Sequence, residues 1–297
     1  WVHFYDWITP KRCGVFRPHR KATNCVLTTG EEHLFTASAD TTVQLWKIAA
    51  GGVLSDDACQ DSIATSVAFK GHDMSVSALE VVNGGHGAET LVTGSRDCSV
   101  RCWDVETGVE LQRAKILRNV VLALRHVPFT RTFVQSSEDL KLRLWDLGSS
   151  APVLDVHSGS NQLVCMDVTS DGRYVICGSK GFSRENCEVK VFDVRGGLRA
   201  LASNACADQT IEALTVTSPE QCLIAGKDGF LRCIAIPDVT VTAEWCLGTA
   251  GCTALAVQAR GGDLGPVALA ALAGPEGAHL KMLEWVEPSL CSAPVTL

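Results

Sequence analysis

A short pattern recurs along the chain and constrains its fold more than any other feature of the sequence. It is clearest in the segments Phe35–Trp46 (FTASADTTVQLW), Val92–Trp103 (VTGSRDCSVRCW) and Val134–Trp145 (VQSSEDLKLRLW). In each segment a serine stands eight residues before the tryptophan and an aspartate stands six residues before it. Repetition of this kind indicates stacked copies of one small structural unit.

Weaker copies extend the pattern over the rest of the chain. Asp228 keeps its spacing in IAGKDGFLRCI, where Ile234 takes the tryptophan position, and further copies end at Phe192, near Leu283 and at Tyr5. Successive anchors lie 41 to 57 residues apart, on a base period of about 42. A period near this value is typical of a unit of four short strands. The copies also hold β-rich runs divided by turn residues, which predicts an all-β fold.

Two dipeptides make the pattern more specific. Trp103-Asp104 and Trp145-Asp146 follow the strand-like runs, and Gly71-His72 precedes the second copy. With these elements the chain resembles the WD-repeat β-propeller family over essentially its whole length. The resemblance implies a propeller with six complete repeats and an incomplete N-terminal blade, hence seven blades. A ring of six blades with an added N-terminal hairpin is the alternative.

The spacing predicts a single propeller domain over residues 1–297. We expect the insertions Gly51–Thr65, Gly181–Asn186 and Arg260–Pro266 to be loops, the first of them acidic through Asp56, Asp57 and Asp61. The expected parts are a partial blade at 1–20, repeats at 21–48, 66–105, 106–147, 148–194, 195–236 and 237–286, and a tail at 287–297.

The family resemblance also implies a buried hydrogen-bond network. In the second copy it would consist of His72, Ser95, Asp97 and Trp103, and we expect this copy alone to hold all four members. The aspartate can accept backbone N–H groups in the tight turn between the second and third strands. Matching network positions in the other copies are Asp40, Trp46, Asp139, Trp145 and Asp228.

Chemical motifs favour a protein without catalytic residues. Ser95, His72 and Asp97 could form a nucleophilic triad on paper, but the resemblance assigns them to the structural network. The sequence contains neither a G-x-S-x-G elbow nor a P-loop. Its histidines lack ligand spacing, it has no C-x-x-C pair, and its acidic loop lacks the calcium-binding frame. We therefore expect no enzyme activity, no small-molecule substrate, no metal and no cofactor.

Composition limits the class of partner and the compartment. The net charge is −7, which argues against a general nucleic-acid binder. The 14 cysteines are too dilute for a disulfide scaffold and fit small buried side chains in a reducing, cytoplasmic setting. No apolar run is long enough to cross a membrane as a helix. The chain begins with Trp1 rather than Met, so we expect a preceding segment, through which alone it would contact a membrane.

Partner binding is predicted at the loops around one end of the blades. By the family pattern, the residue before each turn aspartate lies there, beside the starts of the first strands. The result is a mixed, mildly basic set, and arginine suits carboxylate or phosphate recognition. Ordinary solvated loop residues are the alternative interpretation. The predicted residues are Arg96, Arg118, Asn119, Glu138, Asn161, Lys180 and Lys227.

One stretch suggests a narrower relationship. Gly94–Asp146, followed by the insertion Gly181–Glu188, is similar to a group of small WD-repeat proteins of ciliated organisms. That resemblance implies a non-enzymatic scaffold in assembly of the cilium or flagellum or at its base, with axonemal, transport or small-GTPase-regulator partners. One alternative is the substrate-recognition subunit of a ubiquitin ligase. Another is a component of an RNA-processing assembly, against which the acidic composition counts.

Overall fold

The computed structural model describes residues 2–5, 12–30, 32–48, 63–83, 89–185, 187–258, 267–274, 277–284 and 295–296. These residues form strands and turns, and no helix among them could cross a membrane. They divide into two compact units, Trp1–Asp155 and Val156–Leu297. The acidic loop residues Asp56, Asp57 and Asp61, and the predicted loop Arg260–Pro266, lie outside the described residues.

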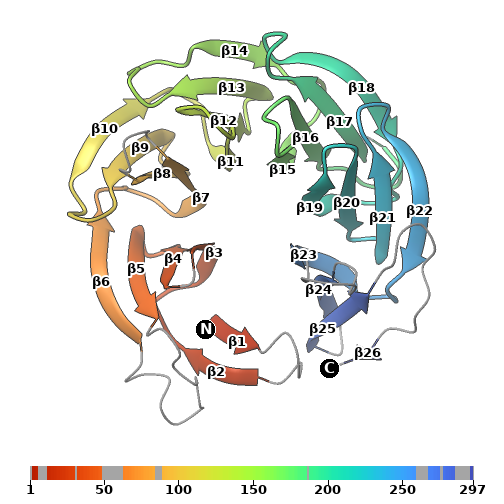
Figure 1. Cartoon of the computed structure of the whole chain (residues 1–297), viewed down its shortest axis with the longest axis horizontal. Helices are drawn as coiled ribbons and strands as arrows, with labels where there is room; N and C mark the ends of the chain where they lie inside the picture. The colour runs from red at the N-terminus through yellow and green to blue at the C-terminus, as the bar shows by residue number, and fades with distance from the viewer. Residues whose placement is uncertain are drawn as a thin grey trace. The chain divides into compact units, whose positions relative to one another are not determined.

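The first unit is built from antiparallel sheets of four strands in chain order, with a two-stranded sheet before them (Figure 1). The short sheet is β1 (Val2–Tyr5) with β2 (Arg12–Phe16). The first full sheet is β3 (Thr23–Thr29), β4 (His33–Ser38), β5 (Thr42–Ile48) and β6 (Ile63–Lys70). The second is β7 (Val76–Asn83), β8 (Glu89–Ser95), β9 (Ser99–Asp104) and β10 (Glu110–Lys115). The third is β11 (Val121–His126), β12 (Thr132–Ser137), β13 (Lys141–Asp146) and β14 (Leu154–His157), whose last strand crosses the unit boundary.

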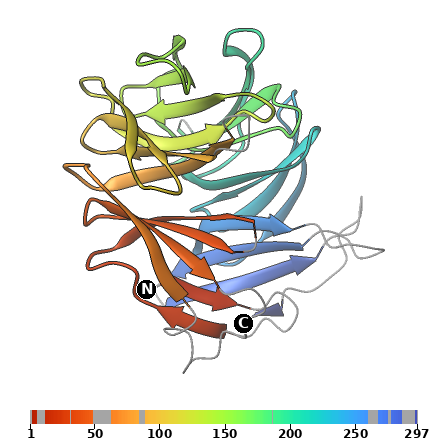
Figure 2. The same cartoon turned by 60° about the vertical axis from the view of Figure 1, so that its left-hand side comes forward.

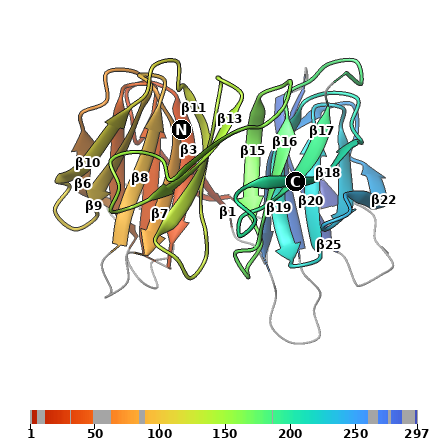
Figure 3. The ribbon, with the colours of Figure 1, turned by 90° about the horizontal axis from the view of Figure 1, so that it is seen from above.

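The second unit repeats the same meander, and Figure 3 shows its strands side by side. Its first sheet is β15 (Leu163–Val168), β16 (Tyr174–Ser179), β17 (Glu188–Asp193) and β18 (Arg199–Ala205). The next is β19 (Ile211–Ser218), β20 (Gln221–Gly226), β21 (Phe230–Ala235) and β22 (Thr240–Cys246). The last is β23 (Gly251–Gln258), β24 (Val267–Gly274), β25 (Gly277–Glu284) and β26 (Val295–Thr296).

The sheets are out of phase with the sequence repeats by one strand. Repeat 106–147, for example, contains β10, which is the last strand of one sheet, and then β11 to β13 of the next. This repeat therefore links two consecutive sheets covalently. The same offset places the anchor residues Trp46, Trp103 and Trp145 on the third strand of their sheets.

In the first unit, apolar side chains on both faces of a sheet are covered by neighbouring sheets. Leu91 packs toward β3–β6 with Phe69 and Trp103, whereas the adjacent Val92 packs toward β11–β14 with Trp145. Alternate side chains of a strand point to opposite faces, so a strand buried on both sides reads as a continuous apolar run. The short sheet β1–β2 lies beside β3–β6 (Figure 2). Val2 and Phe16 form one buried cluster with Leu34 and Trp46.

The first strands of neighbouring sheets contact each other within each unit, β3 with β7 and β7 with β11, then β15 with β19 and β19 with β23. Gly94 permits one of these close approaches, because a Cβ atom there would lie 2.3 Å from Cγ1 of Val121. The Ser77 hydroxyl donates a 2.6 Å hydrogen bond to the Val121 carbonyl across the same gap. Polar and apolar contacts together thus set the distance between the sheets β7–β10 and β11–β14.

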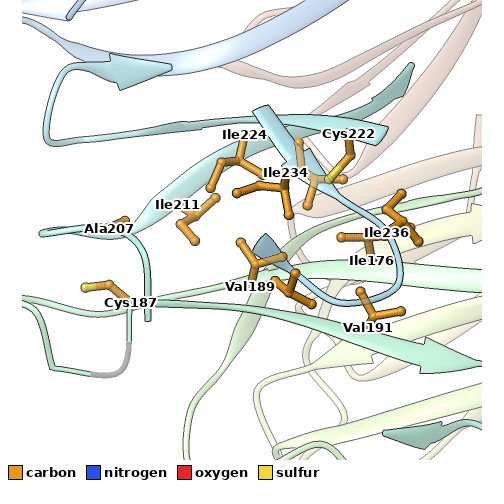
Figure 4. Packing of buried hydrophobic residues seen from close by; sticks show 12 residues of the cluster. Ile176, Cys187, Val189, Val191, Ala207, Ile211, Cys222, Ile224, Ile234 and Ile236 are labelled. Carbon is orange, nitrogen blue, oxygen red and sulfur yellow. The ribbon is translucent and has the colours of Figure 1, made fainter. Parts of the chain in front are cut away.

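An isoleucine-rich layer fills the space between two sheets of the second unit (Figure 4). Ile176 and Val189 from β16 and β17 face Ile211, Ile224 and Ile234 from β19 to β21, and all are 0–1% exposed. β-branched side chains suit such a pleated, two-sided surface. Phe192 and Ile234, in the place of tryptophan, keep this unit apolar at the anchor position.

Candidate functional site

The sheet β7–β10 holds a buried polar network at the end where its second and third strands meet. His72 Nδ1 lies 2.9 Å from Asp97 Oδ2, and His72 Nε2 lies 2.7 Å from Thr93 Oγ1. The Trp103 indole N–H donates to the same threonine oxygen at 2.9 Å. Asp97 also accepts the Ser99 backbone N–H and hydroxyl, at 2.9 and 2.5 Å. The chain of contacts fits a histidine that donates from Nδ1 to the carboxylate and accepts at Nε2 from the threonine.

All four predicted members lie in or beside this network, but Ser95 hydrogen-bonds to neither His72 nor Trp103. Ser95 donates to the Met74 and Ser75 carbonyls, at 3.2 and 3.0 Å, and accepts the Asp97 N–H at 3.1 Å. Its hydroxyl therefore closes the turn, and Thr93 rather than Ser95 joins His72 to Trp103. These contacts support the structural interpretation of Ser95, His72 and Asp97 over a nucleophilic triad, which would need the serine hydroxyl on the histidine.

The expectation that only one copy holds the full network is wrong. In β3–β6, His19 Nδ1 lies 3.1 Å from Asp40 Oδ2, and His19 Nε2 lies 2.8 Å from Thr36 Oγ1. Trp46 Nε1 donates to Thr36 at 2.9 Å, which completes the same arrangement. The Gly-His dipeptide does not identify His19, because Pro18 precedes it where Gly71 precedes His72 in the second copy.

Two other sheets replace the histidine with a buried arginine two residues before the anchor. Arg143 is 1% exposed and pairs with Asp139 by an (i, i+4) ion pair, while Trp145 donates to Gln135 at 2.7 Å. Arg232 is 4% exposed and lies 2.8 Å from Asp228 and 2.5 Å from Glu244. In each of these two sheets a buried arginine thus holds the turn aspartate.

A sequence signal for the missed residues does exist. Thr36, Thr93 and Gln135 all stand ten residues before their tryptophan, and each is 0% exposed within a strand of apolar neighbours. A polar residue that recurs in phase inside a buried strand must be hydrogen-bonded, because burying it without a partner is costly.

Replacement of the bridging threonine should destabilise the protein. Thr93→Val keeps the shape of the side chain but leaves His72 Nε2 and the Trp103 N–H without their partner, at a cost of about 1–3 kcal/mol in unfolding free energy. Urea unfolding followed by circular dichroism measures this difference. Thr93→Ser, which retains the hydroxyl, should lose less; equal losses in the two variants would contradict the bridge.

Acid should weaken the same network. Burial opposes ionisation of Asp97, but hydrogen bonds from His72, Ser99 and the Asp73 backbone N–H outweigh it, and the pKa of Asp97 lies well below its usual range. A carboxyl whose pKa is lowered on folding stabilises the protein above the unfolded value of about 3.9, and this contribution is lost as pH falls toward the folded value. Asp97→Asn should therefore show a smaller loss of stability between pH 7 and pH 3 than wild type, in urea unfolding at both pH values. An equal loss of stability in Asp97→Asn and wild type would contradict the lowered pKa of Asp97. The control is Glu106→Gln, because this side chain is exposed.

The predicted partner-binding residues occupy equivalent positions in their sheets. At the turn between the second and third strands, one backbone N–H donates to the carbonyl of a residue just before the first strand. The five bonds are Ala39 to Ala22 (2.9 Å), Arg96 to Ser75 (3.0 Å), Glu138 to Val120 (2.9 Å), Lys180 to Gln162 (2.8 Å) and Lys227 to Thr210 (2.9 Å). The turn and the start of the first strand therefore lie at one end of each sheet, called here the loop end.

Most of the predicted side chains are open to solvent at this loop end. Arg96, Arg118, Glu138, Lys180 and Lys227 are exposed, and Asn161 is half-buried. Lys227 forms a 2.9 Å ion pair with Glu212. Whether these residues bind a partner stays a prediction.

The prediction that Asn119 contacts a partner is wrong. It is 0% exposed, and its Oδ1 accepts hydrogen bonds from Gln135 and, at 2.8 Å, from Arg143 Nη1. It belongs to the buried network of the third sheet and cannot contact a partner. Its sequence neighbour Arg118 has a left-handed backbone (φ 64°), which turns the chain between the exposed and buried positions.

The second unit has an open hollow of about 630 Å³ at its loop end. It brings together Asn161 and Lys180 with residues of the predicted insertion loop. The lining residues are Asn161, Gln162, Lys180, Gly181, Phe182, Ser183 and Glu185.

The part of the chain that the structure describes contains no cluster of three or more metal-ligating side chains. Among its cysteines, Cys102 and Cys252 are free thiols. Burial raises the pKa of Cys102 to about 12 and that of Cys252 to about 11. These two thiols are therefore protonated at neutral pH and are poor nucleophiles.

Two segments of the chain match a known family of repeats. The family described as "WD domain, G-beta repeat" matches residues 10–47 and 62–104. These two segments are therefore similar to WD repeats. With the four-stranded antiparallel sheets, this match confirms the predicted fold class, an all-β fold of the WD-repeat propeller type. The predicted number of blades and the single domain stay predictions.

Several known proteins are similar in sequence to this chain. It is 28% identical to eukaryotic translation initiation factor 3 subunit I of Anopheles gambiae over 189 residues, 62% of this chain and 54% of that protein. It is 29% identical to the ribosome biogenesis protein WDR12 homolog of Ixodes scapularis, over 54% of this chain and 35% of that protein. It is 32% identical to nuclear distribution protein PAC1 of Arthroderma otae, over 35% of this chain and 25% of that protein. The chain thus spans about half of these relatives' length, or less.

Proposed function

We propose that this chain is a non-enzymatic scaffold that holds partner proteins at the loop ends of its WD-repeat sheets. The observation that carries the proposal is the repeated backbone hydrogen bond, which places a turn residue at the equivalent end of five four-stranded sheets. In four of these sheets a buried network behind the turn holds it in place without using its exposed side chain. Such a rigid frame with variable exposed residues suits recognition rather than chemistry.

The charges at the loop end favour acidic surfaces on a partner. Arg96, Arg118 and Lys180 are exposed, and no ion pair to any of them occurs among the described residues. Exposed cations of this kind guide association with an oppositely charged surface, even in a protein whose net charge is negative.

Charge reversal at two of these positions tests the proposal. Arg96→Glu with Lys227→Glu should leave the melting temperature unchanged, because both side chains are exposed, and should weaken capture of partner proteins from cells in quantitative mass spectrometry. The matched control reverses Lys115 and Arg199, which are exposed on the outer strands β10 and β18. Equal capture by the two double mutants would contradict binding at the loop ends.

For the cellular setting, we propose the cilium or flagellum, on the similarity of Gly94–Asp146 and the following insertion to WD-repeat proteins of ciliated organisms. A fluorescent fusion expressed in a ciliated cell should concentrate at the cilium or its base. A uniform cytoplasmic signal would overturn this setting and leave the scaffold proposal standing.

The names of the relatives favour a second setting, an assembly of the translation or ribosome-biogenesis machinery. In that case the chain should co-sediment with ribosomal subunits in a sucrose gradient. Sedimentation of the whole pool as free protein would argue against it.

A further inference from the structure

The hairpin Gly181–Glu185 lies between β16 and β17, where other sheets have a tight turn between their second and third strands. Elsewhere the turn between second and third strands is tight, as at Arg96–Cys98 and Lys227–Gly229, whereas β16 and β17 are joined by the longer segment 180–187. Phe182 and Glu185 exchange both backbone hydrogen bonds, at 3.2 and 3.0 Å. Ser183 and Arg184 between them have φ angles of 53° and 67°, the signs required by a type I′ turn.

Contacts with the next sheet fix this hairpin in place. The Arg184 guanidinium donates to both carboxylate oxygens of Asp208, at 2.6 and 3.3 Å, and the Arg184 N–H donates to the Asp208 carbonyl at 2.9 Å. At the base of the hairpin, the Thr210 hydroxyl donates to the Gly181 carbonyl at 2.8 Å. The hairpin is therefore ordered before any partner arrives, which reduces the entropy cost of binding.

This fixed hairpin presents an aromatic ring to solvent. Phe182 is 73% exposed, although a phenylalanine gains free energy when it leaves water. It borders the hollow of about 630 Å³, whose other walls carry the amide side chains of Asn161 and Gln162. Exposed aromatic residues on rigid supports are typical anchors of protein interfaces.

The charges around the ring define the complementary ligand. Lys180 and Glu185 line the hollow with opposite charges, and neither side chain has an ion-pair partner among the described residues. Arg184, by contrast, is already neutralised by Asp208. A ligand that satisfies the lining must offer an apolar group, an anion, a cation and amide hydrogen-bonding groups.

We propose that this hollow binds an extended peptide segment of a partner protein, in which an apolar side chain packs on Phe182 between an acidic residue and a basic residue. The acidic residue pairs with Lys180 and the basic residue with Glu185. The Asn161 and Gln162 side chains hydrogen-bond to the peptide backbone. The inference rests on the proposed scaffold function and names the chemistry of one of its partners.

Selection from a phage library of random short peptides against the full chain tests this inference. The expected consensus is an apolar residue flanked by one acidic and one basic residue. Phe182→Ala should weaken a selected peptide about tenfold, and Lys180→Glu and Glu185→Lys should each remove the preference at one charged position. Phe129→Ala, at a 92% exposed ring in the first unit, and Lys115→Glu are the matched controls.

The possible outcomes separate this inference from the broader function. Peptides whose affinity changes with Arg96 or Lys227 but not with Phe182 would overturn the hollow as a site and leave the scaffold proposal standing. A failure to select any peptide, or a consensus without the two charges, would also overturn the inference. The scaffold proposal fails separately, if charge reversal at Arg96 and Lys227 leaves partner capture unchanged.

Discussion

We expect Trp103→Ala to lower the free energy of unfolding by about 3–5 kcal/mol. The ring is 2% exposed and packs edge-on against Phe69, with centroids 5.9 Å apart. Truncation removes this packing from the layer between β3–β6 and β7–β10 and also removes the indole N–H that Thr93 accepts. The loss is therefore larger than that of an ordinary strand residue.

Urea unfolding followed by far-ultraviolet circular dichroism measures the effect without relying on tryptophan fluorescence. Phe129→Ala serves as the control, because a ring that is 92% exposed contributes little packing, and it should change stability by less than about 0.5 kcal/mol. If the two variants unfold at the same urea concentration, Trp103 does not occupy the buried position described here.

Asp139→Ala should be nearly as damaging, with a loss of about 3–5 kcal/mol. Removing the carboxylate leaves the Arg143 guanidinium, which is 1% exposed, without the anion that holds it. Asp155 lies 3.3 Å from Arg143 Nε but is one-third exposed, so it compensates only in part. A buried charge without its partner is far more costly than a missing surface ion pair.

The apolar replacement Arg143→Met distinguishes a buried charge from a general loss of packing. It removes the charge and keeps much of the side-chain volume, so the double variant Asp139→Ala with Arg143→Met should be more stable than Asp139→Ala alone. Unfolding midpoints of the two single variants and the double variant complete the cycle. Additive losses would show that the two side chains do not interact.

The sequence repeat was sufficient to predict the fold class and the positions of the turn residues. The fixed distance between Asp97 and Trp103 spans one turn and one strand, so it reports local geometry that every copy must share. The family resemblance predicts that Arg96, Glu138 and Lys227 lie at equivalent turns, and their backbone hydrogen bonds agree with this placement. Their role in binding cannot follow from spacing, because no local rule requires it.

The repeat did not predict which polar groups meet inside the sheets. Asn119 and Arg143 are 24 residues apart in the chain, and the hydrogen bond between them depends on the pairing of three strands. From its position in the sequence, Asn119 is predicted to be a loop residue that contacts a partner. The burial of Asn119 and Arg143 became apparent only from the assembled sheet.

The sequence by itself therefore determined the repeat, the four-stranded unit and the turn positions, because these depend on residues close together in the chain. The tertiary structure decided that Thr93 bridges His72 and Trp103, that Asn119 is buried, and that Phe182 borders a hollow with Lys180. Those arrangements arise from contacts between separate strands and loops, and their free energy depends on burial that no local pattern encodes.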